Sequence, residues 1–93
     1  MAQNTPDLNK LRQEIDRTDR SIIKSLKTRF SLVRKVGQTK KKQNIPPLDK
    51  NRWKQVLTSR LSWADKAGVD KDFTKQFFDL IHAQALKIED NEK

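Results

Sequence analysis

The chain contains no cysteine among its 93 residues. Disulfide bonds and zinc sites built from cysteine thiolates are therefore excluded. No apolar run approaches the roughly 18 residues that a membrane-spanning helix requires. The first ten residues, MAQNTPDLNK, also lack the apolar stretch of a secretory signal peptide. We therefore expect a cytoplasmic protein without a membrane partner.

Histidine and hydrophobic residues are also scarce. His82 is the only histidine, and no second ligand stands at helical spacing from it, so we expect a packing or surface residue and no metal site. Hydrophobic residues make up 33% of the chain and charged residues 35%. A single domain over residues 1–93 would have a thin core, which oligomerisation would complete.

Basic residues are in clear excess. The chain carries 21 lysines and arginines against 12 acidic residues, which gives a net charge of +9. Such a charge attracts polyanions, phosphates and carboxylates, and it does not determine the fold. One interpretation is a basic helical dimer that binds nucleic acid. Another is a protein that binds a small anion.

The longest regular pattern spans residues 8–42, which contain no proline and a single glycine. Apolar residues recur there at intervals of three and four, or at their sums, which predicts one apolar stripe along a helix about 50 Å long. Thr5 as N-cap, Pro6 at the first helical position and Asp7 in the first turn predict a helix over residues 6–42. The stripe consists of Leu8, Leu11, Ile15, Ile22, Leu26, Phe30, Val33 and Val36.

A helix of this length exceeds the body of a compact domain of about 90 residues, whose radius of gyration is about 12 Å. The remaining residues of one chain cannot cover its apolar stripe. We therefore expect an intertwined homodimer in which the two long helices run antiparallel and the shorter helices pack on both.

The glycine inside this helix, Gly37, is compatible with two interpretations. It permits the close approach of another backbone or of a ligand. Alternatively, it is merely tolerated, at a cost of about 1 kcal/mol relative to alanine. The sequence does not decide between them.

Two shorter helices follow a break at residues 43–47, where two prolines prevent the helix from continuing. Asp49 as N-cap and Gly68 as the closing residue predict a helix over residues 50–66, and Asp70 as N-cap predicts another over 71–90. No segment alternates with a period of two, so we expect an all-α fold of three helices. The predicted buried faces are Trp53, Val56, Leu57, Leu61 and Ala64, and then Phe73, Phe77, Leu80, Ile81, Ala85 and Ile88.

Four basic residues stand out by their positions. Arg29 and Lys40 are eleven positions apart and share one helix face. Arg12 lies about 25 Å before Arg29 along the helix axis, so in an antiparallel dimer it could reach only the partner's ligand. Arg52 follows one turn into the second helix. Cations gathered around one pocket would suit a small dianion, because arginine grips carboxylates bidentately and lysine supplies a point charge.

The run LRQEIDRTDRSIIKSLKTRFSLVRKVGQTKKKQNIPPLDKNRW resembles the all-helical chorismate mutases. The family pattern is L-R-x-x-I-D-x-x-D, then R-x-x-x-[VA]-x-x-[VI]-G-x-x-K, then P-x-x-D-x-x-R. The last helix, FTKQFFDLIHAQALKIE, is also similar to that of the family, so the likeness covers residues 8–89. The matching positions are Leu11, Arg12, Ile15, Asp16, Asp19, Arg29, Val33, Val36, Gly37, Lys40, Pro46, Asp49 and Arg52.

The resemblance implies an intertwined dimer with two equivalent sites for chorismate, a dicarboxylate enol ether that rearranges to prephenate without a cofactor or covalent intermediate. It assigns Arg29 and Arg52, with Arg12 of the partner chain, to the substrate carboxylates. It also places Lys40 on the ether oxygen, where negative charge grows as the C–O bond breaks. Asp49 would help to frame the site.

Three positions depart from the family pattern. Trp53 stands where many members have a glutamate that contacts the ring hydroxyl of the substrate. Ala85 replaces a serine, and Glu89 replaces a glutamine that donates to the ether oxygen. Because a carboxylate has no proton to donate, we expect Glu89 to make the enzyme sensitive to pH, unless it merely pairs with Lys40 or points into solvent.

These departures leave alternatives open. Relatives with this fold act as isochorismate pyruvate-lyases or rearrange 4-amino-4-deoxychorismate, and Trp53 is compatible with either. A mutase activated by another enzyme of the shikimate pathway is a further possibility for so small a chain. The nucleic-acid interpretation explains the charge of +9, but it does not explain why four basic residues match a catalytic pattern. We therefore predict a chorismate mutase that does not bind nucleic acid.

Overall fold

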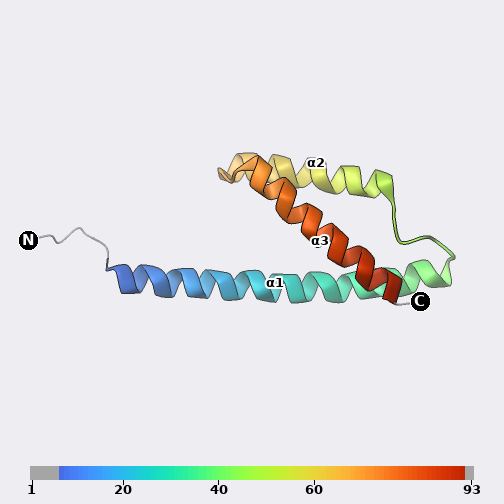
Figure 1. Cartoon of the computed structure of the whole chain (residues 1–93), viewed down its shortest axis with the longest axis horizontal. Coiled ribbons are helices and arrows are strands. Elements are labelled where there is room, and N and C mark those ends of the chain that lie inside the picture. Colours follow the sequence, from blue (N-terminus) through green and yellow to red (C-terminus); the bar gives the residue numbers. More distant parts are fainter. Residues whose placement is uncertain (1–6, 92–93) are drawn as a thin grey trace, which may run out of the picture. The chain divides into compact units, whose positions relative to one another are not determined.

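The computed structural model describes residues 7–91, which form three α-helices and no strand. Helix α1 spans Leu8–Lys42, α2 spans Lys50–Ala67 and α3 spans Lys71–Asn91 (Figure 1). The predicted all-α class with one very long helix is confirmed, and the predicted helix ends are correct to within two residues. The chain divides into two compact units, Met1–Ser31 and Leu32–Lys93, which are described separately. The single domain over residues 1–93 stays a prediction.

The first unit contains most of α1, and its helix start differs from the prediction. The carboxylate of Asp7 accepts a hydrogen bond from the backbone N–H of Asn9 at 2.8 Å. Asp7 is therefore the capping residue and does not lie in the first turn, which contains no acidic residue. The predicted roles of Thr5 and Pro6 lie outside the described residues.

The apolar stripe of the first unit is exposed in the single chain. The exposed fractions are 41% for Leu11, 58% for Ile15 and 44% for Ile22. These side chains recur along one face of a helix that is otherwise charged. An apolar face of this length without cover is typical of a protein–protein interface.

In the second unit, α2 and α3 run in opposite directions and contact each other (Figure 1). Their shared core contains Val56 and Ala64 from α2, and Ile81 and Ala85 from α3. The ring of Trp53 in α2 also stacks on the ring of His82 in α3, with centroids 4.0 Å apart and 13° between the planes. The α2–α3 pair is therefore held by small apolar residues in its centre and by one aromatic pair.

The ends of α2 and α3 follow the capping rules. The carboxylate of Asp49 accepts a hydrogen bond from the backbone N–H of Arg52 at 3.0 Å, and Asp70 caps Phe73 in the same way at 2.7 Å. Gly68 has φ +74°, and α2 closes there with the hydrogen bonds of a Schellman turn. All three predicted capping residues are confirmed.

The predicted buried face of α3 is partly wrong. Phe73 and Leu80 are 58% and 73% exposed, whereas the polar residue Thr74 is buried. The hydroxyl of Thr74 can enter the core because it donates to the backbone oxygen of Asp70 at 2.8 Å. The apolar stripe of α3 is wider than α2 can cover, so α2 contacts the Thr74–Ile81–Ala85 side and leaves the other side exposed.

Candidate active site

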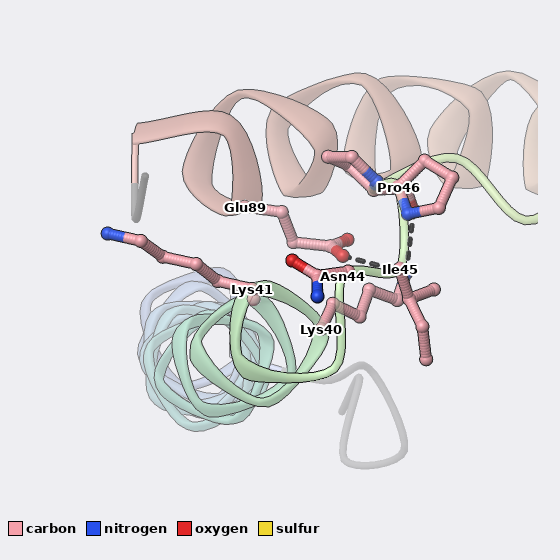
Figure 2. Close-up of a pocket in the computed structure, with 8 residues that line it drawn as sticks. Lys40, Lys41, Asn44, Ile45, Pro46 and Glu89 are labelled. Atoms are coloured by element: carbon pink, nitrogen blue, oxygen red, sulfur yellow. Dashed lines mark hydrogen bonds and ion pairs between the residues drawn. The ribbon is translucent and has the colours of Figure 1, made fainter.

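A pocket of about 450 Å³ lies in the second unit, where the chain leaves α1 and the end of α3 approaches it (Figure 2). This volume falls within the range of small-molecule binding sites. Two lysines and one glutamate supply the charged groups of its lining. The lining consists of Gly37, Lys40, Lys41, Asn44, Ile45, Pro46, Pro47 and Glu89.

One wall of the pocket is the turn that ends α1. Asn44 has φ +57°, a left-handed conformation that asparagine tolerates better than most residues. The N–H of Ile45 donates to the backbone oxygen of Lys40 at 2.8 Å, and the N–H of Asn44 donates to that of Lys41 at 3.2 Å. This pair of bonds is the Schellman pattern. It turns the chain so that the Pro46–Pro47 segment passes beside the last turn of α1 (Figure 2).

The ammonium of Lys40 is anchored by two acceptors. It lies 2.8 Å from the Oε1 atom of Glu89 and donates to the backbone oxygen of Pro47 at 2.6 Å. The Lys40 side chain is 20% exposed and that of Glu89 is 9% exposed. An ammonium carries three donors, and the hydrogen bond to Pro47 uses one of them, so Lys40 can still donate to a bound molecule.

The carboxylate of Glu89 is only partly satisfied. Its Oε1 atom is buried and makes no well-aligned hydrogen bond, although the Lys40 ammonium is close. The contact is therefore an ion pair whose geometry does not meet the angular requirement of a hydrogen bond. A buried acceptor without an aligned donor costs free energy in the folded protein.

Four predicted site residues of the second unit lie outside the lining of this pocket. Asp49 caps α2 and thereby fixes the backbone of Arg52. Trp53 lies against His82, and Ala85 is buried on α3 one turn before Glu89. The structure therefore brings together Lys40 and Glu89 among the predicted residues, and the roles of the other four in binding stay predictions.

Arg12 and Arg29 belong to the first unit. Arg12 is exposed and Arg29 is half-buried. Their approach to a substrate, including the reach of Arg12 into the site of a partner chain, stays a prediction.

A second basic cluster occupies α2. The guanidinium of Arg60 lies 4.6 Å from the ring centroid of Trp63 and donates to the hydroxyl of Ser59 at 2.9 Å. Partial burial, and then the positive charge of Arg52, lower the pKa of Arg60. The two arginines are therefore close enough to repel each other, and an anion beside Arg52 would relieve this repulsion.

Two parts of the pocket were not predicted from the sequence, namely Asn44 and the carbonyl group of Pro47. Asn44 gave a signal that could have been used, because asparagine just after a helix often adopts the left-handed conformation that closes it. The carbonyl group of Pro47 gave no such signal, because every residue has a carbonyl group and only the turn brings this one to Lys40.

Within residues 7–91, no group of three histidine, aspartate or glutamate side chains could hold a metal ion. In the same range, no helix has the length and apolar character to cross a membrane.

Comparison with known proteins identifies the family. The sequence pattern of the family described as chorismate mutase type II matches residues 11–90. The chain belongs to this family. The resemblance inferred from the motifs is thereby confirmed, and the Lys40–Glu89 pocket belongs to a chain with the family's helical fold.

Three similar proteins have assigned names. The 4-amino-4-deoxychorismate mutase of Streptomyces pristinaespiralis is 26% identical over 89 residues, which cover 96% of this chain and 69% of that protein. The enzyme of the same name from Streptomyces venezuelae is 24% identical over 84 residues, covering 90% of this chain and 82% of the enzyme. The T-protein of Haemophilus influenzae is 37% identical over 65 residues, covering 70% of this chain but only 17% of that protein.

Proposed function

We propose that this protein is a chorismate mutase, which rearranges the enol ether chorismate to prephenate. The observation that carries the proposal is the Lys40 ammonium, held at the edge of a pocket of about 450 Å³ in a member of this family. In the rearrangement the ether C–O bond breaks while a C–C bond forms within the same molecule. No atom is gained or lost, so the protein has only to hold a reactive conformer and stabilise the developing charge.

Lys40 suits the second task. Its hydrogen bond to Pro47 and its ion pair with Glu89 hold the ammonium in place before substrate arrives. A donor positioned in advance beside the oxygen that gains negative charge needs no reorganisation during the reaction. Glu89 acts in this proposal as the carboxylate that holds the Lys40 ammonium.

The substrate carboxylates require further cations. We assign Arg29 and Arg52 to them, together with Arg12 from the partner chain of an antiparallel homodimer. The exposed apolar stripe of α1 supports the dimer, because Leu11, Ile15 and Ile22 would otherwise remain in water.

A second candidate function is the rearrangement of 4-amino-4-deoxychorismate. The two relatives that match at least 90% of this chain carry that name. Their amino substrate differs from chorismate by an ammonium group in place of the ring hydroxyl. The flat face of Trp53 suits a cation, since indole rings attract ammonium groups.

Product identification separates these functions. The purified protein would be incubated separately with chorismate, isochorismate and 4-amino-4-deoxychorismate, and the products would be resolved by chromatography and mass spectrometry. We expect prephenate from chorismate. Selective conversion of the amino compound would establish the second candidate, and pyruvate release from isochorismate would establish a lyase. Turnover of none, with salt-sensitive binding to duplex DNA, would support the nucleic-acid interpretation instead.

Two variants test whether turnover depends on the pocket. Lys40→Met keeps most of the side-chain volume but removes the charge, and we expect it to abolish conversion of whichever substrate is used. Lys75→Met removes the charge of an exposed lysine that pairs with Asp79 at 2.8 Å on α3. This variant should retain full activity, because exposed ion pairs contribute little.

A further inference from the structure

Gly37 lies where α1 contacts Glu89 of α3 in the second unit. It is the one buried residue of α1. A Cβ atom added at Gly37 would lie 3.0 Å from the Cα atom of Glu89, and 3.4 Å from both its Cβ and Cγ atoms. The closest of these neighbours is backbone, which cannot rotate away as a flexible side chain would. A methyl group at this point therefore fits only if α3 moves away from α1 by a few tenths of an ångström.

The same contact controls the reach of the Glu89 side chain. The Cγ atom of Glu89, which carries the carboxyl group, lies over Gly37, and Lys40 follows Gly37 by about one helical turn on the same face of α1. The carboxylate consequently reaches the Lys40 ammonium at 2.8 Å while the Glu89 side chain remains 9% exposed. An α3 displaced outward would lengthen this contact and open it to water.

We propose that Gly37 is a positioning residue for the reaction, which acts by fixing the separation of the Glu89 carboxylate and the Lys40 ammonium. The proposal rests on the proposed function of this pocket, and it adds a residue that would not contact the substrate itself. By admitting the backbone of Glu89 onto α1, Gly37 holds the carboxylate that orients the Lys40 donor. Its substitution should therefore affect the rate constant more than the binding of substrate.

The competing interpretation, a glycine that the helix merely tolerates, makes the opposite prediction. Alanine forms helices better than glycine, so Gly37→Ala would then leave the pocket intact and make the protein more stable. The contact of 3.0 Å with the Glu89 backbone predicts instead that α3 must shift.

The test compares Gly37→Ala with Gly68→Ala. Gly68 is a matched control, because a Cβ atom there would meet nothing within 4 Å and would strain only the φ of +74° that closes α2. Gly68→Ala therefore destabilises the second unit without adding an atom at the pocket. If Gly37→Ala lowers the stability or the activity more than Gly68→Ala does, the additional loss arises from the contact between α1 and α3.

The first measurement does not depend on activity. The ¹³C shift of the Glu89 carboxyl carbon and the ¹⁵N shift of the Lys40 ammonium would be recorded at one neutral pH in the folded proteins. We expect both shifts to change in Gly37→Ala and to keep their wild-type values in Gly68→Ala. Unchanged shifts in Gly37→Ala would overturn the positioning role, whether or not the protein is a mutase.

The second measurement is kinetic, on the substrate that the wild-type protein converts. We expect Gly37→Ala to lower kcat by a factor of about 2 to 10, because α3 must move by a few tenths of an ångström and a misplacement near 1 Å costs about 100-fold, while KM changes little. Gly68→Ala should keep kcat at temperatures where it is folded. In a Glu89→Ala background, Gly37→Ala should lower kcat no further, because no carboxylate remains to be displaced. A full additional loss would contradict action through Glu89.

A variant that leaves Gly37 in place keeps the proposal testable if Gly37→Ala does not fold. Glu89→Asp withdraws the carboxylate by one methylene group and adds no atom at the crossing. We expect this variant to lower kcat to a similar extent as Gly37→Ala and to keep the wild-type melting temperature. Wild-type kcat in Glu89→Asp would show that the separation from Lys40 does not matter, and it would overturn the proposal.

Discussion

The ammonium of Lys40 lies 2.8 Å from the carboxylate of Glu89, and both side chains are mostly buried in the same pocket. One residue comes from the last turn of α1 and the other from the end of α3. A basic and an acidic group at this distance hold each other in place, and of the two only the ammonium can donate to a substrate oxygen. The position of the Lys40 donor therefore depends on Glu89.

Removing the charge of Lys40 should remove most of the catalysis. In Lys40→Met the developing charge on the ether oxygen loses its donor, and the Glu89 carboxylate loses its partner in a buried site. We expect kcat to fall by a factor on the order of 100 to 1,000, as for other preorganised donors. Steady-state kinetics would measure this loss. A variant that retained wild-type kcat would place the reaction away from Lys40.

Glu89→Gln should raise the activity at neutral pH. Glu89 pairs with Lys40 at 2.8 Å, which is the alternative under which no sensitivity to pH was expected. Glutamine keeps an oxygen that can accept from Lys40 and adds a permanent N–H donor for the ether oxygen. Steady-state kinetics of the two proteins at one neutral pH would measure the gain. Equal kcat values would show that a donor at position 89 does not assist the reaction.

Arg12 should act across the dimer interface. We expect Arg12→Ala and Arg29→Ala to be nearly inactive when separate, because each leaves one substrate carboxylate without its cation. In a mixed dimer of the two variants, one of the two sites draws an intact Arg12 from one chain and an intact Arg29 from the other. That site should regain activity. Heterodimers that form but remain inactive would show that Arg12 serves its own chain or has another role.

The dimer itself should be obligatory. Because Leu11, Ile15 and Ile22 are 41%, 58% and 44% exposed in one chain, we expect no folded monomer at micromolar concentration and a melting temperature that rises with protein concentration. Sedimentation velocity and circular dichroism would test both. Ile15→Glu should weaken the dimer, whereas a change at the exposed Lys75 should leave it intact. A stable helical monomer would contradict the prediction of an obligatory dimer.

Much of the helical framework could be predicted from local chemistry. The apolar spacing and the capping residues Asp49, Gly68 and Asp70 gave α1, α2 and α3 to within two residues, because these signals act within one turn of the helix end. The start of α1 was misplaced: Asp7 was predicted in the first turn after a Thr5 cap, whereas its carboxylate accepts a hydrogen bond from the backbone N–H of Asn9 and caps the helix.

Packing between helices was harder to predict. Phe73 and Leu80 were expected to be buried with Ile81, but a periodicity argument cannot tell which side of a wide apolar stripe meets the neighbouring helix. The Lys40–Glu89 pair depends on a contact between segments almost fifty residues apart, and no local spacing encodes that distance. The motif pointed to both residues, whereas the structure supplied their ion pair and the role of the Pro47 carbonyl group.

One acceptor of Lys40 is the backbone oxygen of Pro47. A side-chain acceptor can be lost through a single change in the gene, but a main-chain oxygen persists whatever residue replaces its neighbours, provided that the turn keeps its shape. A library that randomises the side chains around Lys40 would therefore keep the hydrogen bond from Lys40 to the Pro47 oxygen. The loop that contains Pro47 is for this reason a tolerant place to seek altered substrate preference, and the conformation of Asn44 is the constraint that such a search should retain.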